Sequence, residues 1–367
     1  MIRIKSPGRI CLFGEHQDYL DYPIISMAIS KYIYLEAKRI PEKKFEISLP
    51  NLNQFMEISL NNKELDYTSK RDYLISGYNQ FIRKKFKFKK GYKIKITGDI
   101  PINAGVASSS ALVICWLYFL NFITDRKLKP FQMALEGYNT EVTEFQEGGG
   151  MMDHFTSVFG NLIFLKPEEP KPQLKLYDFS LDGFVLGNSM EKKATVDDLV
   201  RTKFSSLEAF ETLNTIFPKF NRFRTKLEDT ELYLPSLKEE HKKKIIGNII
   251  NRDITYKAKK LIKNQIFLVK KGISPNVDLD FYHKLGTLLN QHQEQLRDNI
   301  GISTNKINKI IDACVEAGAY GCKINGSGFG GTMFALFPNN EQILNKTIST
   351  VGGKAYIIKT SCGVETY

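Results

Sequence analysis

The sequence predicts an α+β protein with two domains, and three observations indicate this class. Short β-like runs and helical patterns are mixed in both halves of the chain. Beyond about residue 200 the pattern changes to long amphipathic helices, followed by further short strands. A length of 367 residues is enough for two medium domains, each with its own core. We therefore expect one domain at residues 1–195 and a second at residues 196–367.

The N-terminal half is expected to combine short strands with buried helices. Residues 92–97 (YKIKIT) alternate with a period of two and predict a strand. The apolar run at residues 108–122 predicts a buried helix. A helical pattern resumes at residues 131–145, and a short helix is expected from Met151. The other expected strands are residues 2–5, 10–13, 32–38, 45–49, 55–60 and 161–165.

The C-terminal half is expected to be mainly helical. Heptad-like apolar spacing predicts amphipathic helices. These helices are residues 239–249, 251–271, 278–299 and 304–317. The end of the chain predicts two strands, a helix and a last strand, at residues 321–324, 332–337, 341–351 and 354–359.

The composition favours a cytoplasmic protein with no membrane partner. Hydrophobic residues make up 42% and charged residues 25% of the chain, which is ordinary for soluble proteins. No apolar run approaches the roughly 20 residues that span a bilayer, and the N-terminus lacks the features of a signal peptide. The five cysteines are odd in number and never form a C-x-x-C pair. This spacing argues against a disulfide framework and a zinc site.

The net charge of +12 is compatible with nucleic-acid binding, but the sequence lacks the other signs of it. Lysines are spread along the chain in short clusters, such as residues 83–90 and 241–244. No helix-turn-helix signal, zinc-finger spacing or aromatic-basic RNA-binding signature is present. We therefore expect no nucleic-acid partner and interpret the surplus as a solvated surface that attracts phosphate-bearing substrates.

A glycine-containing turn at residues 101–111 runs directly into a helix. Gly105 is followed by three serines, Ser108 to Ser110, and then by apolar residues. A helix start leaves backbone N–H groups unpaired and carries a partial positive charge, so a phosphate chain could approach it closely. Serine hydroxyls add donors, and one could bind Mg²⁺. An ordinary N-cap serine before a core helix is the alternative interpretation.

A second glycine-rich segment extends from Gly326 to Gly331 and matches G-x-G-x-x-G. The following residues, TMFALF, resemble a strand, so the strand–turn–helix context of a dinucleotide site is missing. No G-x-x-x-x-G-K-[ST] is present, which excludes a P-loop. The segment could close over phosphates as a flexible loop, and a glycine-bulged hairpin is the alternative.

Polar residues cluster in a third segment, residues 6–19 (SPGRICLFGEHQDY). Arg9, Glu15, His16 and Asp18 follow a short strand and could converge on one polar ligand. A sugar suits such a site because each hydroxyl both donates and accepts hydrogen bonds. A solvated turn is the alternative for any single residue.

Taken together and in their order along the chain (residues 6–19, 101–111 and 326–331), these segments resemble the three signature motifs of the GHMP kinase superfamily. Residues 6–19 are most similar to the galactokinase signature, and residues 141–153, ending in Met-Met-Asp, resemble another galactokinase stretch. The resemblance implies a two-lobed α+β fold. Its N-terminal lobe would be like ribosomal S5 domain 2 and its C-terminal lobe ferredoxin-like, with the active site in the cleft between them. It also implies a phosphotransferase that uses ATP and Mg²⁺ to phosphorylate a sugar hydroxyl, by analogy the anomeric one.

The resemblance assigns a role to each matching residue. Asp153 and Arg9 would be catalytic, Asp153 as a base or orienting group and Arg9 as a charge neutraliser. The sugar would be bound by Glu15, His16, Asp18 and Gly150. Ser109 and Glu141 would hold Mg²⁺. The ATP phosphates would be bound by Gly105, Val106, Ala107, Ser108, Ser109, Ser110, Gly326 and Gly328.

Three departures from the galactokinase pattern lie where substrate choice is expected. His154 stands where galactokinases have Gln, residues 20–22 replace the usual turn, and residues 186–195 contain a K-x-A-T typical of other branches. Mevalonate kinase and heptose-phosphate or uronate kinase therefore remain alternatives, as does a non-catalytic sugar sensor. A monomer and a homodimer are both compatible with the sequence.

Overall fold

A strongly twisted sheet with long central strands forms the N-terminal lobe. The computed structural model describes residues 1–102, 104–125, 127–168, 171–191, 196–273 and 278–367. Six strands lie in the order β12-β1-β2-β5-β3-β4, and β6 pairs with β2 and β7. All neighbours are antiparallel except β3 and β5. The strands are β1 (Ile2–Phe13), β2 (Ile24–Ile40), β3 (Lys44–Leu49), β4 (Gln54–Ser59), β5 (Gly91–Gly98), β6 (Leu162–Lys166), β7 (Gln173–Tyr177) and β12 (Glu365–Thr366).

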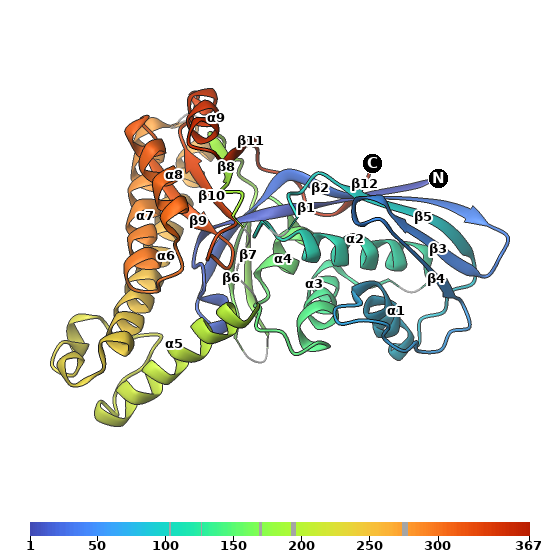
Figure 1. The fold of residues 1–367 in the computed structure, drawn as a ribbon, viewed down its shortest axis with the longest axis horizontal. Coiled ribbons are helices and arrows are strands. Elements are labelled where there is room, and N and C mark those ends of the chain that lie inside the picture. Colours follow the sequence, from blue (N-terminus) through green and yellow to red (C-terminus); the bar gives the residue numbers. More distant parts are fainter. Residues whose placement is uncertain (103, 126, 169–170, 192–195, 274–277) are drawn as a thin grey trace.

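Helices α1 to α4 cover one face of this sheet (Figure 1). Helix α2 carries apolar residues nearly all round and is the most buried of them, since Trp116 and Phe119 are both fully buried. It lies against β1 and β2, which places its first residues beside the end of β1. The helices are α1 (Tyr73–Arg83), α2 (Ser108–Ile123), α3 (Pro130–Tyr138) and α4 (Met152–Phe159).

The C-terminal lobe has the ferredoxin-like arrangement that the family resemblance implies. Its antiparallel sheet has the order β11-β8-β10-β9, so the first of its strands lies beside the last. Helices flank this sheet, and α5 projects away from it along α6 (Figure 1). The strands are β8 (Phe184–Asn188), β9 (Gly321–Asn325), β10 (Thr332–Leu336) and β11 (Lys354–Ile358). The helices are α5 (Val196–Ile216), α6 (Glu239–Lys270), α7 (Leu279–Asp298), α8 (Asn305–Glu316) and α9 (Glu341–Thr350).

Short helical turns complete the chain. They are η1 (Asp18–Leu20), η2 (Pro50–Leu52), η4 (Glu228–Thr230), η5 (Leu234–Ser236) and the π-helical turn η3 (Asn139–Thr143). Two of them contain site candidates, because η1 begins at Asp18 and η3 contains Glu141.

The two lobes share one hydrophobic core. Ile10 and Phe13 at the end of β1 belong to the same buried cluster as Ile254 of α6, Leu285 of α7 and Phe334 of β10. The end of β1 is therefore held from both sides, and the loop that follows it enters the space between the lobes.

The expected domain division lies at residues 192–195, which are outside the described residues, and it stays a proposal. Strand pairing crosses the expected domain division in both directions. Strand β8 precedes residue 195 but pairs with β10 and β11, and the last strand, β12, pairs with β1.

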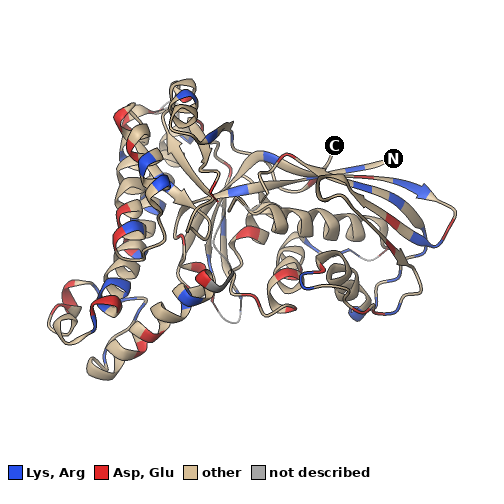
Figure 2. Ribbon diagram, in the orientation of Figure 1, with Lys and Arg blue, Asp and Glu red and all other residues tan. Residues whose placement is uncertain are grey.

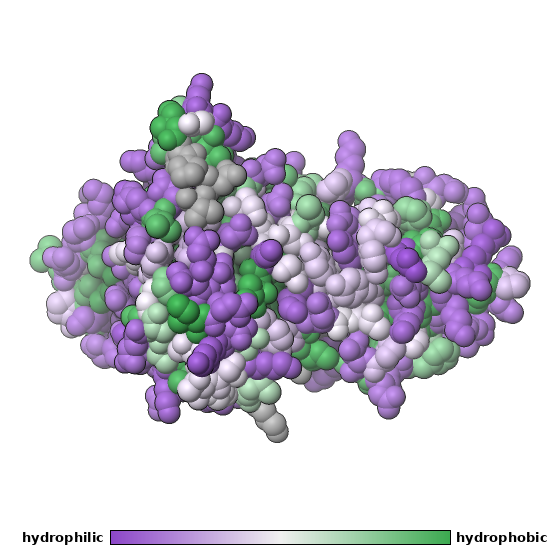
Figure 3. All heavy atoms as spheres, turned by 90° about the horizontal axis from the view of Figure 1, so that it is seen from above, coloured by the Kyte–Doolittle hydropathy of each residue, from purple (hydrophilic) through white to green (hydrophobic). Residues whose placement is uncertain are grey.

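Charged residues of both signs are interspersed over both lobes (Figure 2). The face in Figure 3 is mostly hydrophilic, with hydrophobic side chains in small separate groups. Within the described ranges, no helix combines the length and the apolar character needed to cross a membrane.

Candidate active site

A cavity of about 870 Å³ brings the separate motifs together. This volume lies within the range of small-molecule sites, roughly 300–1,000 Å³. The loop after β1, the start of α2, the π-helical turn η3, the start of α4 and the loop after β9 all contribute to its wall. The predicted residues that line it are Arg9, Glu15, His16, Asp18, Gly105, Ala107, Ser108, Ser109, Ser110, Glu141, Gly150, Asp153 and Gly326.

Two residues predicted to bind ATP, Val106 and Gly328, do not line the cavity. Val106 is buried, and its carbonyl accepts a hydrogen bond from the Arg9 backbone N–H at 3.2 Å. Gly328 has a φ of 74°, and a Cβ there would lie 2.7 Å from Ile302. Both residues contribute to the packing of their loops and do not face the cavity.

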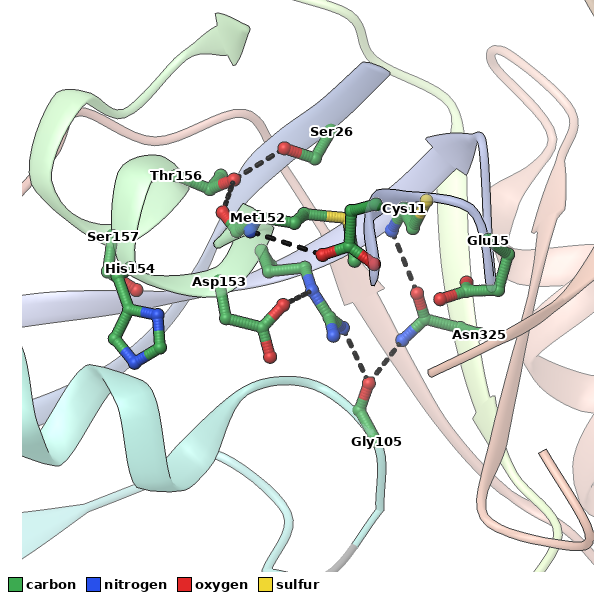
Figure 4. Close-up of polar contacts among 12 residues, drawn as sticks. Cys11, Glu15, Ser26, Gly105, Met152, Asp153, His154, Thr156, Ser157 and Asn325 are labelled. Atoms are coloured by element: carbon green, nitrogen blue, oxygen red, sulfur yellow. Dashed lines mark hydrogen bonds and ion pairs between the residues drawn. The ribbon is translucent and has the colours of Figure 1, made fainter. Parts of the chain in front are cut away.

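Arg9 and Asp153 form the ion pair that the family resemblance implies. Arg9 Nε donates to Asp153 Oδ1 at 2.6 Å, and Arg9 Nη1 donates to the Gly105 carbonyl at 2.6 Å (Figure 4). The Arg9 side chain is 5% exposed and that of Asp153 is 24% exposed. Burial lowers the pKa of Arg9, but the charges of Asp153 and Glu15 outweigh it and raise the pKa. The guanidinium is therefore a fixed positive charge beside a carboxylate that is accessible from the cavity.

The two glycine-rich segments contact each other through their backbones. Asn325 Nδ2 donates to the Gly105 carbonyl at 2.9 Å, and its Oδ1 accepts the Cys11 N–H at 2.9 Å (Figure 4). A Cβ on Gly105 would lie 2.8 Å from the Asn325 carbonyl oxygen, and one on Gly326 would lie 2.6 Å from the Gly105 carbonyl oxygen. Both glycines also have positive φ values, 82° in each case. Only glycine allows this approach, which fixes the turn before α2 relative to the C-terminal lobe.

The start of α2 presents donors to the cavity. Its N-cap, Ala107, has a left-handed φ of 62°, and no side chain caps the helix. Ser108, Ser109 and Ser110 line the cavity. The unpaired N–H groups of this first turn and the positive end of the helix dipole favour an anion at this position. The interpretation of this segment as a plain N-cap serine is wrong, because Ala107 occupies the cap.

Acidic groups gather at the other end of the cavity, around the loop after β1. Glu15 and Asp18 are 2% and 8% exposed, and Asp18 lies near both Glu15 and Asp153. His16 contacts the Tyr19 hydroxyl at 2.7 Å and the Ser327 carbonyl at 3.0 Å. These contacts tie the loop after β1 to the loop after β9.

Asp18 is held against the start of α4. Its carboxylate accepts the Met152 N–H at 3.3 Å and the Tyr19 N–H at 3.0 Å. A Cβ at position 150 would lie 1.9 Å from Asp18 Oδ2, so Gly150 has to be glycine for the carboxylate to fit. Burial, with the charge of Asp153 second, raises the pKa of Asp18 to about 6.

We expect Asp18→Asn to gain stability relative to the wild type as the pH rises. The carboxyl pKa is about 6 in the folded protein and 3.8 ordinarily. Between these values the folded state binds more protons, so wild-type stability falls with rising pH and the loss is complete above pH 6. Asn has no such titration. From pH 4 to 7.5 the difference in unfolding free energy should move by about 1–3 kcal/mol toward the variant.

Denaturant unfolding at both pH values measures this difference. An unchanged difference would contradict the raised pKa. If Asp18 also binds the substrate, catalytic efficiency should fall at least about tenfold in the same variant, the scale of one lost charged hydrogen bond.

Glu141 is a buried carboxylate behind the serine turn. Its Oε2 lies 2.7 Å from His154 Nε2. Burial raises the pKa of Glu141, but hydrogen bonds from His154, Ser109 and Ser110 together hold it below its usual value. In the described part of the chain, no group of three or more His, Cys, Asp or Glu could hold a metal. A hydroxyl and one ionised carboxylate still fit Mg²⁺, which commonly takes one or two carboxylates plus substrate phosphates.

Sequence reasoning missed several residues of the cavity. Arg71 and Glu147 lie 2.6 Å apart as an ion pair at its wall. The other lining residues outside the prediction are Tyr19, Tyr73, Val142, Gly148, Gly149, Met152, His154, Leu199 and Ser327. Arg71 and Tyr73 carry no motif, so only the fold brings them here, whereas Met152 and His154 flank the predicted Asp153 and could have been included.

Comparison with family models supports the same assignment along most of the chain. Residues 72–161 match the GHMP kinases N terminal domain and residues 279–346 match the GHMP kinases C terminal domain. Residues 2–39 match the galactokinase galactose-binding signature.

Relatives and solved structures include two kinds of kinase. The chain is 26% identical to the mevalonate kinase of Pyrococcus furiosus, covering 97% of this chain and 95% of that protein. It is also 26% identical to the galactokinase of the same organism, covering 99% of each. A crystal structure of Lactococcus lactis galactokinase complexed with galactose matches with a TM-score of 0.82 and 21% identity, over 99% of this chain and 94% of that one. A mevalonate kinase structure matches with a TM-score of 0.67 and 20% identity, over 98% and 99%. The chain belongs to the GHMP kinase superfamily and is a phosphotransferase with an alcohol group as acceptor.

Proposed function

We propose that this chain is an ATP- and Mg²⁺-dependent sugar kinase that phosphorylates the anomeric hydroxyl of a neutral sugar such as galactose. The observation that carries the proposal is the acidic acceptor end of the cavity. Glu15, Asp18 and Asp153 all line the cavity there, Asp18 lies near both of the others, and Arg9 is bound to Asp153. Carboxylates accept hydrogen bonds from hydroxyl groups, so the arrangement suits a polyol.

The same charges disfavour an anionic acceptor. No lysine lines the cavity among the described residues, and both arginines there already have carboxylate partners. Arg9 pairs with Asp153 and Arg71 with Glu147. A carboxylate or phosphate on the acceptor would therefore meet like charges without a free guanidinium, which costs binding energy.

The geometry of Asp153 and Arg9 supports the roles that the family resemblance assigns to them. Phosphoryl transfer requires positioning and charge stabilisation more than covalent assistance. Asp153 would orient the acceptor hydroxyl and take its proton. Arg9 would orient that carboxylate and offset negative charge between it and the transferred phosphoryl group. Because Arg9 is also bound to the Gly105 carbonyl, it fixes the position of the acceptor side relative to the turn before α2.

The donor side would be formed by the start of α2. Its backbone N–H groups and the Ser108 to Ser110 hydroxyls would hold the ATP phosphates, with Gly105, Ala107 and Gly326 allowing close approach. Ser109 and Glu141 would hold Mg²⁺, which when bound offsets negative charge on the β- and γ-phosphates. His154 would orient Glu141 through the 2.7 Å contact.

We expect Ser109→Ala to raise the Mg²⁺ concentration for half-maximal activity by about tenfold, the lower end of the effect of altered metal-site residues. The lost hydroxyl is a proposed direct ligand. A Mg²⁺ titration of ATP binding by calorimetry gives the same information without turnover. Ser205→Ala is the matched control, because the Ser205 hydroxyl also donates to a carboxylate, that of Glu240, but does not line the cavity, and it should leave the titration near that of the wild type. Equal titrations of wild type and Ser109→Ala would remove Ser109 from the metal site.

Mevalonate kinase is the second candidate, because a mevalonate kinase is as similar in sequence as a galactokinase. The K-x-A-T stretch that pointed to other branches ends in residues 192–195, outside the described residues. The paired arginines argue against it, since mevalonate carries a carboxylate. The same argument applies to heptose phosphates and uronates.

A coupled ADP-release assay with Mg·ATP tests the proposal. The acceptors are galactose, N-acetylgalactosamine, arabinose, glucuronate, galacturonate, a heptose 7-phosphate and mevalonate. We expect turnover with a neutral sugar and none with the four anionic acceptors. Turnover with mevalonate alone would contradict the sugar assignment, and intact ATP binding without turnover on any acceptor would favour a sensor.

The cytoplasmic location and the monomeric or homodimeric state remain predictions.

A further inference from the structure

A lysine lies fully buried behind the acceptor end of the cavity. Lys323 in β9 has no exposed surface, and it is absent from the cavity wall. Its Nζ donates to Glu15 Oε2 at 3.1 Å and to the Ile324 carbonyl at 2.7 Å. The amine also lies 5.5 Å from the centre of the Phe334 ring. Lys323 was not among the residues that the sequence pointed to.

The strand that carries Lys323 is fixed on two sides. It pairs with β10, where Lys323 lies opposite Phe334. On the other side, the backbone N–H groups of Cys322 and Ile324 donate to side chains of α7, both at 2.8 Å. The amine is therefore held in place by backbone contacts before any ligand is bound.

Burial of an ammonium group is costly unless a charge and hydrogen bonds compensate for it. Glu15 supplies that charge from the other lobe, and its own side chain is 2% exposed. The need is mutual, because the buried Glu15 carboxylate also requires a compensating charge. Each group of the pair is the other's partner in the ion pair.

The pair faces the cavity through Glu15 alone. Glu15 lines the cavity, whereas its Oε2 is bound to Lys323 from behind. This leaves Oε1 as the oxygen that can accept a hydrogen bond from a ligand. A neutral carboxylic acid, or a carboxylate rotated away from the cavity, would be a weaker acceptor for a ligand hydroxyl.

We propose that Lys323 is a positioning residue for sugar recognition, holding the Glu15 carboxylate oriented toward a sugar hydroxyl. The inference rests on the proposed sugar kinase activity. The competing explanation is a structural pin, meaning an ion pair that only holds the two lobes together, because the pair joins residues 308 positions apart. The two explanations differ in whether replacing Lys323 changes the KM for the sugar alone.

Lys323→Met is expected to raise the KM for the sugar by at least about tenfold, the scale of one charge-assisted hydrogen bond. The KM for ATP should change by less than about twofold, because the phosphate side of the cavity is formed by other residues. A structural pin would instead affect both KM values together, or neither. Steady-state kinetics with each substrate varied in turn separate these outcomes.

Lys244→Met is the matched control. Lys244 in α6 is also buried, and its Nζ donates to the Ile300 carbonyl at 2.7 Å. It does not line the cavity. This variant also loses a buried ammonium, and we expect both KM values to stay within about twofold of the wild type, a shift well below the 1.4 kcal/mol of a tenfold change.

A double variant keeps the test valid if Lys323→Met folds poorly. Lys323→Met/Glu15→Gln buries no unpaired charge, so it should fold better than the single lysine variant. If Lys323 acts through Glu15, the double variant and Glu15→Gln alone should have the same KM for the sugar.

Three results would overturn the inference. They are an additive double variant, a Lys323→Met enzyme with an unchanged sugar KM, and a Lys323→Met enzyme in which the KM values for sugar and ATP rise together. Failure of the proposed function is distinguishable, since the wild type would then phosphorylate no sugar, and both conclusions would fall.

Discussion

Replacing Asp153 with Asn should lower kcat at least about a hundredfold while leaving ATP binding nearly intact, as expected for loss of a positioned acid–base group. Asn keeps the size of the side chain and an oxygen that can accept from Arg9 Nε, the 2.6 Å contact of the wild type. It cannot take a proton from the acceptor hydroxyl, and it removes the charge that Arg9 offsets. The loss should therefore fall on turnover.

Turnover by ADP release and ATP affinity by calorimetry together check this prediction. Asp280→Asn is a suitable control, because Asp280 is a 74% exposed helix residue paired with Lys284. Its kcat should equal that of the wild type. An undiminished kcat in Asp153→Asn would exclude Asp153 from the mechanism.

Arg9→Met should lose kcat at least about a hundredfold and also lose stability. Its guanidinium donates to both the Asp153 carboxylate and the Gly105 carbonyl, so in the variant Asp153 loses its ion-pair partner and the Gly105 carbonyl keeps only its bond from Asn325. Breaking a buried ion pair costs about 3–5 kcal/mol. Because the Asp153 side chain is 24% exposed, we expect about 2–3 kcal/mol here, the lower end of that range or less.

Arg252→Met separates the two effects. Arg252 is a buried arginine that likewise pairs with a carboxylate, Asp253, and donates to two backbone carbonyls. It does not line the cavity. The control should lose comparable stability in denaturant unfolding and keep its kcat. If both arginine variants lost kcat in proportion to stability, Arg9 would have only a structural role.

Arg9→Lys tests the geometry of the same site. A lysine has one nitrogen and cannot reproduce the separate bonds from Nε and Nη1. We expect it to retain more stability than Arg9→Met but to remain well below wild-type kcat. Full activity would show that only a positive charge is required.

The local chemistry of the ATP segment could be predicted from the sequence. A helix at residues 108–122 was expected, and α2 spans Ser108–Ile123. The run is apolar throughout, and Gly105 and the serines precede it, so local signals agree with the fold. The predicted strand at residues 92–97 likewise lies within β5 (Gly91–Gly98).

Elements that depend on tertiary packing were missed or divided. Helix α1 contains Gly77, which lowers helix propensity, but a Cβ there would lie 2.9 Å from Trp116 and Leu117. The glycine is thus required by the approach of α2.

Helix α6 was predicted as two helices separated at residue 250, whereas it is continuous. Buried polar residues such as Asn251 obscure its apolar stripe. Strand β1 was predicted as two short strands for a similar reason, because Pro7 and Gly8 interrupt the pattern at a bulge.

Contacts between the lobes could not be read from the sequence. Asn325 and Lys323 support the site from β9, and their partners Cys11 and Glu15 lie more than 300 positions away. No local pattern reports such a contact. The motif residues could be identified because each segment has its own chemistry, while the residues that orient them depend on how the two sheets meet.

The measurement that tests the central claim most directly is the identity of the product in a competition. The protein is incubated with Mg·ATP, galactose and mevalonate at equal concentrations, and the products are examined by phosphorus NMR. We predict a sugar 1-phosphate, recognised by coupling of the phosphorus to the anomeric proton, and no phosphorylated mevalonate. Phosphomevalonate as the main product, or a sugar phosphorylated at another carbon, would contradict the account.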